Sequence, residues 1–121
     1  MKQLDIIIPH ERLDKLNAIL YNHQVGGMLY FDIKGRGRVK REPIEERVHG
    51  YGGYKTGKKY TPEFGTRTKI EVLVSDSTYK QIVDEILNTV STGSAADGKI
   101  FVKDISEAYD IGTKQNGDPA L

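Results

Sequence analysis

The apolar residues at the start of the chain change their spacing after Pro9. The short β-branched run Leu4–Ile8, which Pro9 ends, predicts a buried strand. From His10 onwards the apolar side chains recur at helical spacing instead: Leu13, Leu16, Ile19 and Leu20. Gly26-Gly27 then interrupts the pattern, so we expect a helix that begins near His10 and ends at these glycines.

The rest of the chain repeats these two patterns. Three further apolar runs predict strands: Met28–Ile33, Lys69–Val74 and Ile100–Val102. Between the last two strands one helical face gathers Tyr79, Ile82, Val83, Ile86, Leu87 and Val90. Ser75 and Asp76 precede this helix as candidate N-terminal caps. The polar end of the chain carries a turn signal at Asn116–Pro119.

The order strand-helix-strand-strand-helix-strand predicts an α+β, ferredoxin-like βαββαβ fold with an antiparallel sheet and both helices on one face. The other sheet face then needs a cover. The second and third strands should form a hairpin, yet 35 residues, 34–68, separate them. Hairpin loops normally have about 2–5 residues, and structureless loops longer than about 12–15 residues are usually functional or disordered, so this loop is the main anomaly of the chain.

Length and composition indicate one globular domain, residues 1–121, with 37% hydrophobic and 29% charged residues. The chain contains no cysteine, which excludes disulfide and thiol chemistry and suits the reducing cytoplasm. No window reaches the roughly 18 consecutive apolar residues that a membrane-spanning helix needs. We therefore expect a soluble, cytoplasmic protein without direct membrane insertion.

The charge is spread unevenly along the chain. The formal net charge of +1 provides no general attraction to nucleic acid. Between Lys34 and Lys69, however, eleven lysines and arginines face only four acidic residues. A basic middle between acidic ends predicts that the middle meets anions.

Two short segments combine glycine with basic side chains. In Lys34–Arg38, which follows the second predicted strand, the glycines let a ligand approach the backbone and the cations contact anions. Residues 92–99, Thr-Gly-Ser-Ala-Ala-Asp-Gly-Lys, lead into the last strand in a similar way. Each segment is also an ordinary kind of turn, so neither alone defines a phosphate site.

Other chemistry is only weakly indicated. His10, His23 and His49 are too scattered to predict a metal site, and no spacing suggests a catalytic triad, so we expect no enzyme activity. The segment 50–60 mixes tyrosines with basic residues, which suits stacking on single-stranded nucleic acid. A partner-docking loop explains the same composition, and the near-neutral net charge favours it. A nucleic-acid-binding module is the alternative function.

Taken in chain order, the two glycine-basic segments and the long loop between them resemble the PII signal-transduction family over almost the whole chain. The opening residues 1–8, the run Asp97–Val102 and the ending Gly117–Leu121 carry the likeness as well. The resemblance implies a T-loop at 36–66, a B-loop at 92–99 and a C-terminal segment at 105–121.

The resemblance also implies a mode of action. Such proteins are homotrimers with their sheets turned inward, which would cover the open sheet face. They bind ATP or ADP as a regulatory ligand in clefts between subunits, without a tightly bound cofactor. Their T-loop regulates a target protein, a membrane transporter or a metabolic enzyme, in nitrogen metabolism.

Carried over position by position, the resemblance places nucleotide contacts in three parts of the chain. These are Ile7 near the adenine, Gly35, Arg36, Gly37 and Arg38 at the base of the T-loop, and Asp97, Gly98 and Lys99 in the B-loop. In the effector loop itself, Tyr51 or Tyr54 stands near the family's modifiable tyrosine.

Four positions depart from the family pattern. Val39 replaces a glutamine that helps hold Mg²⁺ and 2-oxoglutarate, and valine has no oxygen donor. Ala96 replaces a B-loop glycine, and Asp110 and Gly112 stand where two phosphate-binding arginines belong. We therefore expect a divergent member that binds 2-oxoglutarate poorly and discriminates weakly between ATP and ADP.

Overall fold

The computed structural model describes residues 1–38, 43–47, 55–60 and 64–121. The elements in chain order are β1 (Lys2–Ile8), η1 (His10–Arg12), α1 (Leu13–Asn22), β2 (Met28–Gly35), β3 (Ile44–Arg47), β4 (Lys55–Tyr60), β5 (Gly65–Val74), α2 (Tyr79–Val90), β6 (Lys99–Asp104) and η2 (Asp118–Ala120). The two α-helices and the four strands of the main sheet match the predicted elements in type and order.

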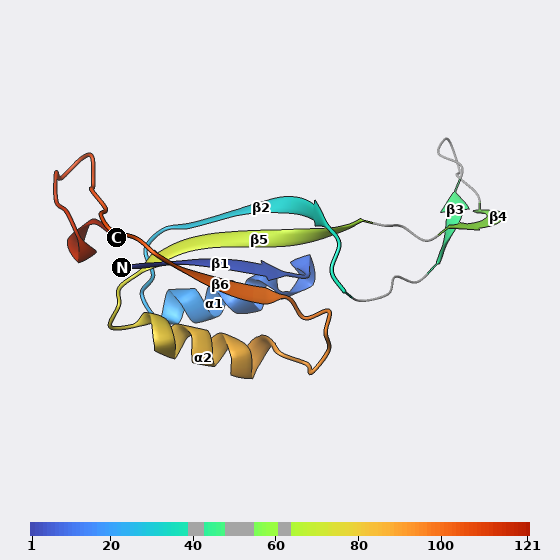
Figure 1. Cartoon of the computed structure of the whole chain (residues 1–121), viewed down its shortest axis with the longest axis horizontal. Coiled ribbons are helices and arrows are strands. Elements are labelled where there is room, and N and C mark those ends of the chain that lie inside the picture. Colours follow the sequence, from blue (N-terminus) through green and yellow to red (C-terminus); the bar gives the residue numbers. More distant parts are fainter. Residues whose placement is uncertain (39–42, 48–54, 61–63) are drawn as a thin grey trace.

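Four strands form one antiparallel sheet in the order β2-β5-β1-β6. β1 lies inside the sheet and pairs with β5 along its whole length and with β6 from Lys2 to Ile7. Figure 1 shows both helices on the same face of this sheet. The predicted ferredoxin-like α+β fold is therefore confirmed.

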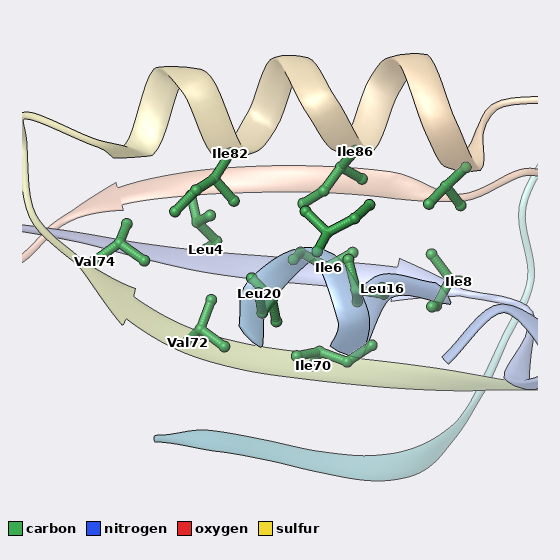
Figure 2. Close-up of a cluster of buried hydrophobic side chains, with 12 residues drawn as sticks. Leu4, Ile6, Ile8, Leu16, Leu20, Ile70, Val72, Val74, Ile82 and Ile86 are labelled. Atoms are coloured by element: carbon green, nitrogen blue, oxygen red, sulfur yellow. The ribbon is translucent and has the colours of Figure 1, made fainter. Parts of the chain in front are cut away.

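The core lies between the sheet and the helices, and Figure 2 shows its side chains meeting there. Alternate positions of β1 and β5 supply Leu4, Ile6, Ile8, Ile70, Val72 and Val74, and the helices supply Leu16, Ile19, Leu20, Ile82, Ile86 and Val90. Each such buried side chain stabilises the fold by about 1.5–3 kcal/mol relative to exposure. Leu87, which the helical pattern includes, is exposed.

The segment between β2 and β5 contains a small second sheet that the sequence pattern did not predict. β3 pairs with β4 in antiparallel register, with an irregularity between Glu45 and Arg47. Figure 1 shows this hairpin beyond the ends of β2 and β5. The interruption of the main sheet is also shorter than expected, because β2 and β5 stay paired as far as Gly35 opposite Gly65.

The end of α1 differs from the prediction that Gly26-Gly27 stops the helix. The N–H of Val25 donates to the oxygen of Leu20 at 3.0 Å, and that of Gln24 to Tyr21 at 2.9 Å. Gln24 has φ +58°, so it takes the left-handed position that closes such a helix end. The helix stops at Asn22 because its own backbone bonds close it, before the glycines are reached.

The predicted caps of α2 are wrong. The helix begins at Tyr79 after Thr78, and no side chain caps its first turn. The Ser75 hydroxyl instead lies 2.8 Å from that of Thr78. The Asp76 carboxylate pairs with the N-terminal ammonium of Met1 at 3.0 Å, so it is drawn towards the chain terminus and away from the helix.

The predicted turn at Asn116–Pro119 is present, because the N–H of Ala120 donates to the oxygen of Gly117 at 2.9 Å, and the residues before it also fold back. Tyr109 and Asn116 form an antiparallel bridge. The carboxylate of Asp110 accepts the N–H of Thr113 at 2.8 Å, which holds the pKa of Asp110 below its usual value. The short helix η2 follows and brings Leu121 beside Gly26.

Candidate functional site

The sheet places three of the expected contact regions at one of its ends. β1 and β2 finish at this end, and β5 and β6 begin there (Figure 1). Ile7 lies opposite Lys99 on β6, so the expected adenine contact and the last B-loop residue are neighbours. The base of the expected T-loop leaves the sheet at the same end, from Gly35.

The glycine-basic segment after β2 presents its side chains to solvent. Lys34, Arg36 and Arg38 are all exposed. Among the described residues, no atom beyond its chain neighbours lies within 4 Å of a Cβ built on Gly37, and the same is true of Gly35. These glycines therefore leave open space where a ligand can approach the backbone, as the sequence pattern indicates.

The B-loop is held together by one carboxylate, that of Asp97. Its Oδ2 accepts the N–H groups of Thr92 at 2.6 Å and Ser94 at 3.2 Å. Its Oδ1 accepts the Thr92 hydroxyl at 2.6 Å and Nη1 of Arg12 at 2.8 Å. The Thr92 hydroxyl and N–H, together with Arg12, hold the pKa of Asp97 well below its usual range.

This geometry changes the interpretation of Asp97. Its carboxylate points into the loop, where donors of the loop and Arg12 already surround it. The loop thus folds around an anion of its own chain, which is the arrangement of backbone donors that also suits phosphate. The sequence pattern did not single out Arg12, and no spacing within the motif points to it.

Gly98 fixes the B-loop against β1. It has φ +119°, and a Cβ at this position would lie 1.9 Å from the main-chain oxygen of Ile7. Only glycine fits a positive φ with the backbone of β1 this close. The contact brings the loop directly over Ile7 and starts β6 at Lys99, whose side chain is exposed.

The two glycine-basic segments lie on opposite edges of the sheet. β5 and β1 separate β2 from β6, which places the two edges about 14 Å apart at the usual strand spacing. β2 also runs three register positions beyond Ile8, or about 10 Å further along the sheet. Within the sheet of one chain, Gly35 is therefore well separated from Lys99.

The C-terminal positions that replace the expected arginines lie at the opposite end of the sheet. β6 runs away from the B-loop, and Figure 1 shows the segment after it on the side where the N-terminus lies. Asp110 is occupied in holding its turn, and Gly112 lies beside the Asp110 carboxylate. Within one chain neither residue meets the B-loop or Gly35.

The sheet face away from the helices carries an ionic cluster among apolar side chains. Asp5 is 3% exposed and accepts Nζ of Lys103 at 2.6 Å and Nε2 of Gln3 at 2.7 Å. Burial raises the pKa of Asp5, but these hydrogen bonds outweigh it and hold the pKa below its usual value. Exposed apolar side chains surround the cluster on this face: Leu29, Phe31, Leu73 and Phe101.

The remaining candidates from the sequence are the three histidines, Val39 and the two loop tyrosines. In the ranges that the structure describes, no three His, Cys, Asp or Glu side chains gather as metal ligands. His10 contacts the Thr68 hydroxyl at 2.9 Å, and His23 pairs with Glu85 between the helices. Val39, His49, Tyr51 and Tyr54 lie outside the described residues.

Comparison with known proteins gives consistent matches over the whole chain. The family model "Nitrogen regulatory protein P-II" matches residues 1–115. The nitrogen regulatory protein P-II of Klebsiella oxytoca and P-II 1 of Escherichia coli K12 are each 34% identical over 121 residues, covering 100% of both chains. The solved structure of B. subtilis GlnK superposes with a TM-score of 0.71 at 25% identity, covering 99% of this chain and 97% of GlnK. Among the helices that the structure describes, none is long and apolar enough to cross a membrane.

Proposed function

The chain belongs to the P-II family of nitrogen regulatory proteins, and from that premise we propose that it binds an adenine nucleotide between subunits of a homotrimer. Its function is P-II-type signalling in nitrogen metabolism. The relatives are named as regulators, so we propose no catalytic step. The proposed ligand is ATP or ADP, bound reversibly.

The observation that carries this proposal is the placement of the two glycine-basic segments. Both lie at one end of the sheet, but β5 and β1 keep them on separate edges of it. The resemblance assigns nucleotide contacts to both segments, and the expected adenine contact, Ile7, lies beside Lys99. A second copy that supplies the Gly35–Arg38 edge beside the first copy's Lys99 would complete such a site.

The open sheet face supports the association. Leu29, Phe31 and Phe101 expose apolar area there, around an ion pair whose acid is already buried. Burying exposed apolar surface stabilises association by roughly 25 cal/mol per Å². Three copies that turn these faces inward would cover them, and closed symmetry limits the assembly.

We propose that the T-loop segment, 36–66, reports the ligand state to a target protein. This segment begins where the proposed phosphate contacts lie, and it contains the β3–β4 hairpin. A two-stranded hairpin is only marginally stable by itself, so a partner can readily order or reshape it. The target is a membrane transporter or a metabolic enzyme.

The ligand preference should differ from that of a typical relative. Asp110 and Gly112 stand where the resemblance places two phosphate-binding arginines, and Asp110 adds a negative charge. Each missing charged hydrogen bond is worth roughly 1.5–3 kcal/mol, so the γ-phosphate adds little affinity here. We propose that ATP and ADP bind with similar affinity, and that Val39 leaves 2-oxoglutarate without its metal-linked contact.

Two measurements on the wild-type chain test the function. Isothermal calorimetry with ATP and with ADP should show saturable binding at one site per chain. Light scattering coupled to gel filtration should report about three times the 13.6 kDa of one chain. A monomer at micromolar concentration would refute the intersubunit site, and a tenfold preference for ATP would refute the proposed ligand preference.

The alternative, a nucleic-acid-binding module, predicts a different pattern. Binding to single-stranded oligonucleotides would weaken steeply with salt, because displaced counterions drive it. ATP and ADP would not compete with it. The same calorimetry, with an oligonucleotide as titrant at two salt concentrations, separates the two functions.

A further inference from the structure

Arg12 joins three elements that are far apart in the sequence. It stands at the N-cap of α1, and its Nη1 donates to the main-chain oxygen of Val90 at 2.8 Å and to Oδ1 of Asp97 at 2.8 Å. Val90 ends α2, so this oxygen is one of those that a helix end leaves without an intrahelical donor. One guanidinium thus links the start of α1, the end of α2 and the loop before β6.

The ion pair between Arg12 and Asp97 is sheltered from solvent. Their side chains are 24% and 15% exposed. Such a partly buried pair is screened less by salt than a pair on the open surface. Asp97 in turn holds the N–H groups of Thr92 and Ser94, so the anchoring of Arg12 extends to the backbone of the B-loop.

Direct contact between Arg12 and a phosphate is the competing interpretation. Nη1 is shared between the Val90 oxygen and Asp97, and a shift towards a ligand would break both hydrogen bonds. It would also leave the Asp97 carboxylate without its cation next to the arriving anion. The geometry therefore favours a role that acts through Asp97.

We propose that Arg12 is a positioning residue for the B-loop. Through Asp97 it holds residues 92–97 in the shape that sets Gly98 over Ile7 and directs β6 to begin at Lys99. The consequence for ligand affinity rests on the proposed function, because the B-loop's contact with phosphate belongs to it. The effect on the loop itself does not depend on any ligand.

Three variants test the role. R12Q removes the cation, and R12K keeps the charge but not the planar guanidinium. K15Q removes one exposed positive charge from α1, which Arg12 directly precedes, and is the matched control. Hydrogen exchange of the Thr92 and Ser94 amides, followed by NMR, reports the loop without ligand. Calorimetry with ADP reports binding, and circular dichroism confirms that each variant is folded.

We expect R12Q to speed exchange at Thr92 and Ser94 by about tenfold, because local opening of the loop becomes easier. ADP affinity should fall by about tenfold in R12Q and by less than about threefold in R12K, since a lysine still pairs with Asp97. K15Q should match the wild type in both measurements.

Equal exchange in R12Q and K15Q would overturn the positioning role. So would an ADP affinity in R12Q equal to that of K15Q despite faster exchange. If the wild type itself binds no adenine nucleotide, the proposed function fails, and the exchange rates still decide whether Arg12 holds the loop.

Discussion

The two α-helices are followed by loops that are closed in opposite ways. After α1, the chain turns through Gln24 and satisfies the helix end with backbone bonds from residues 23–25. After α2, Ser91 is extended, and the last helical oxygen, that of Val90, is capped by Arg12 from 78 residues away. The first loop is closed by local backbone bonds, whereas the second combines the local bonds of Asp97 with tertiary contacts from Arg12.

The two loops also lie at opposite ends of the sheet. The locally closed loop leads into β2 at the end of the sheet where the termini lie, and the other leads into β6 at the end that carries the glycine-basic segments (Figure 1). Backbone bonds between neighbours form whenever the helix forms. The loop that relies on Arg12, Asp97 and Gly98 reaches its native conformation only when the whole sheet is assembled. Substitutions in this loop should therefore change stability and ligand binding more than substitutions in the first loop.

The largest effect should come from adding one methyl group to the second loop. Gly98→Ala would place a Cβ 1.9 Å from the Ile7 oxygen at a φ of +119°, and clash and backbone strain together should cost about 3 kcal/mol or more. Gly37→Ala adds the same atom in open space and should change stability by less than about 0.5 kcal/mol. Urea unfolding of both variants measures the contrast, and a Gly98→Ala loss below about 1 kcal/mol would contradict it.

The next effect concerns ligand binding at the end of the same loop. Lys99→Ala should weaken ADP binding about ten- to a hundredfold, because one charged hydrogen bond is worth roughly 1.5–3 kcal/mol. Lys80→Ala removes an exposed lysine from α2 and is the matched control. Calorimetry that finds equal ADP affinities for the two variants would exclude Lys99 as a phosphate contact.

The third effect is a pH dependence that only the second loop should show. The pKa of Asp97 is lowered in the folded chain, so its contribution to stability is complete above the ordinary value of 3.8 and is lost as the pH falls below it. Asp97→Asn should therefore make stability fall less steeply between about pH 6 and about pH 3 than in the wild type. Asp84→Asn, at an exposed position of α2, should keep the wild-type slope. Urea midpoints across this range decide the matter, and parallel curves for wild type and Asp97→Asn would show that the carboxylate is not responsible.

The smallest effect should come from the first loop. Gln24→Gly replaces a side chain at φ +58° with the residue that adopts this conformation freely, and we expect a gain of about 0.5 kcal/mol. Asn22→Gly, at the last helical residue, should instead lose about 0.5–1 kcal/mol. The thermal unfolding midpoint of Gln24→Gly should lie above that of the wild type, and the midpoint of Asn22→Gly should lie below it. The reverse order would mean that the left-handed residue at the end of α1 does not reduce stability.

The main sheet and helices could be predicted because their signals are repeated along the chain. In β5 the apolar residues at alternate positions are the buried ones. In α2 the residues at helical spacing, Ile82, Ile86 and Val90, are buried as well. The β3–β4 hairpin could not be predicted in this way. β4 reads Lys-Thr-Gly-Lys-Lys-Tyr, without the apolar alternation that marks a half-buried strand.

The candidate site was only partly predictable. Gly98 and Lys99 became candidates because glycine and lysine in a turn carry a local signal, and the structure places them beside Ile7. The inward orientation of Asp97 and the role of Arg12 arise from contact between residues 12, 90 and 97, which no local pattern encodes. Gln24 was missed because a glycine two positions later offered the stronger stop signal.

The long pairing of β5 has a mechanical consequence. β2 and β5 leave the sheet together towards the hairpin, and β5 is bonded to β2 on one side and to β1 on the other. A pull on the hairpin along the strand axis would load the β5–β1 ladder in shear, where the perpendicular hydrogen bonds share the force. A partner that binds the hairpin is thus connected through β5 to the interior of the sheet and through β2 to its edge.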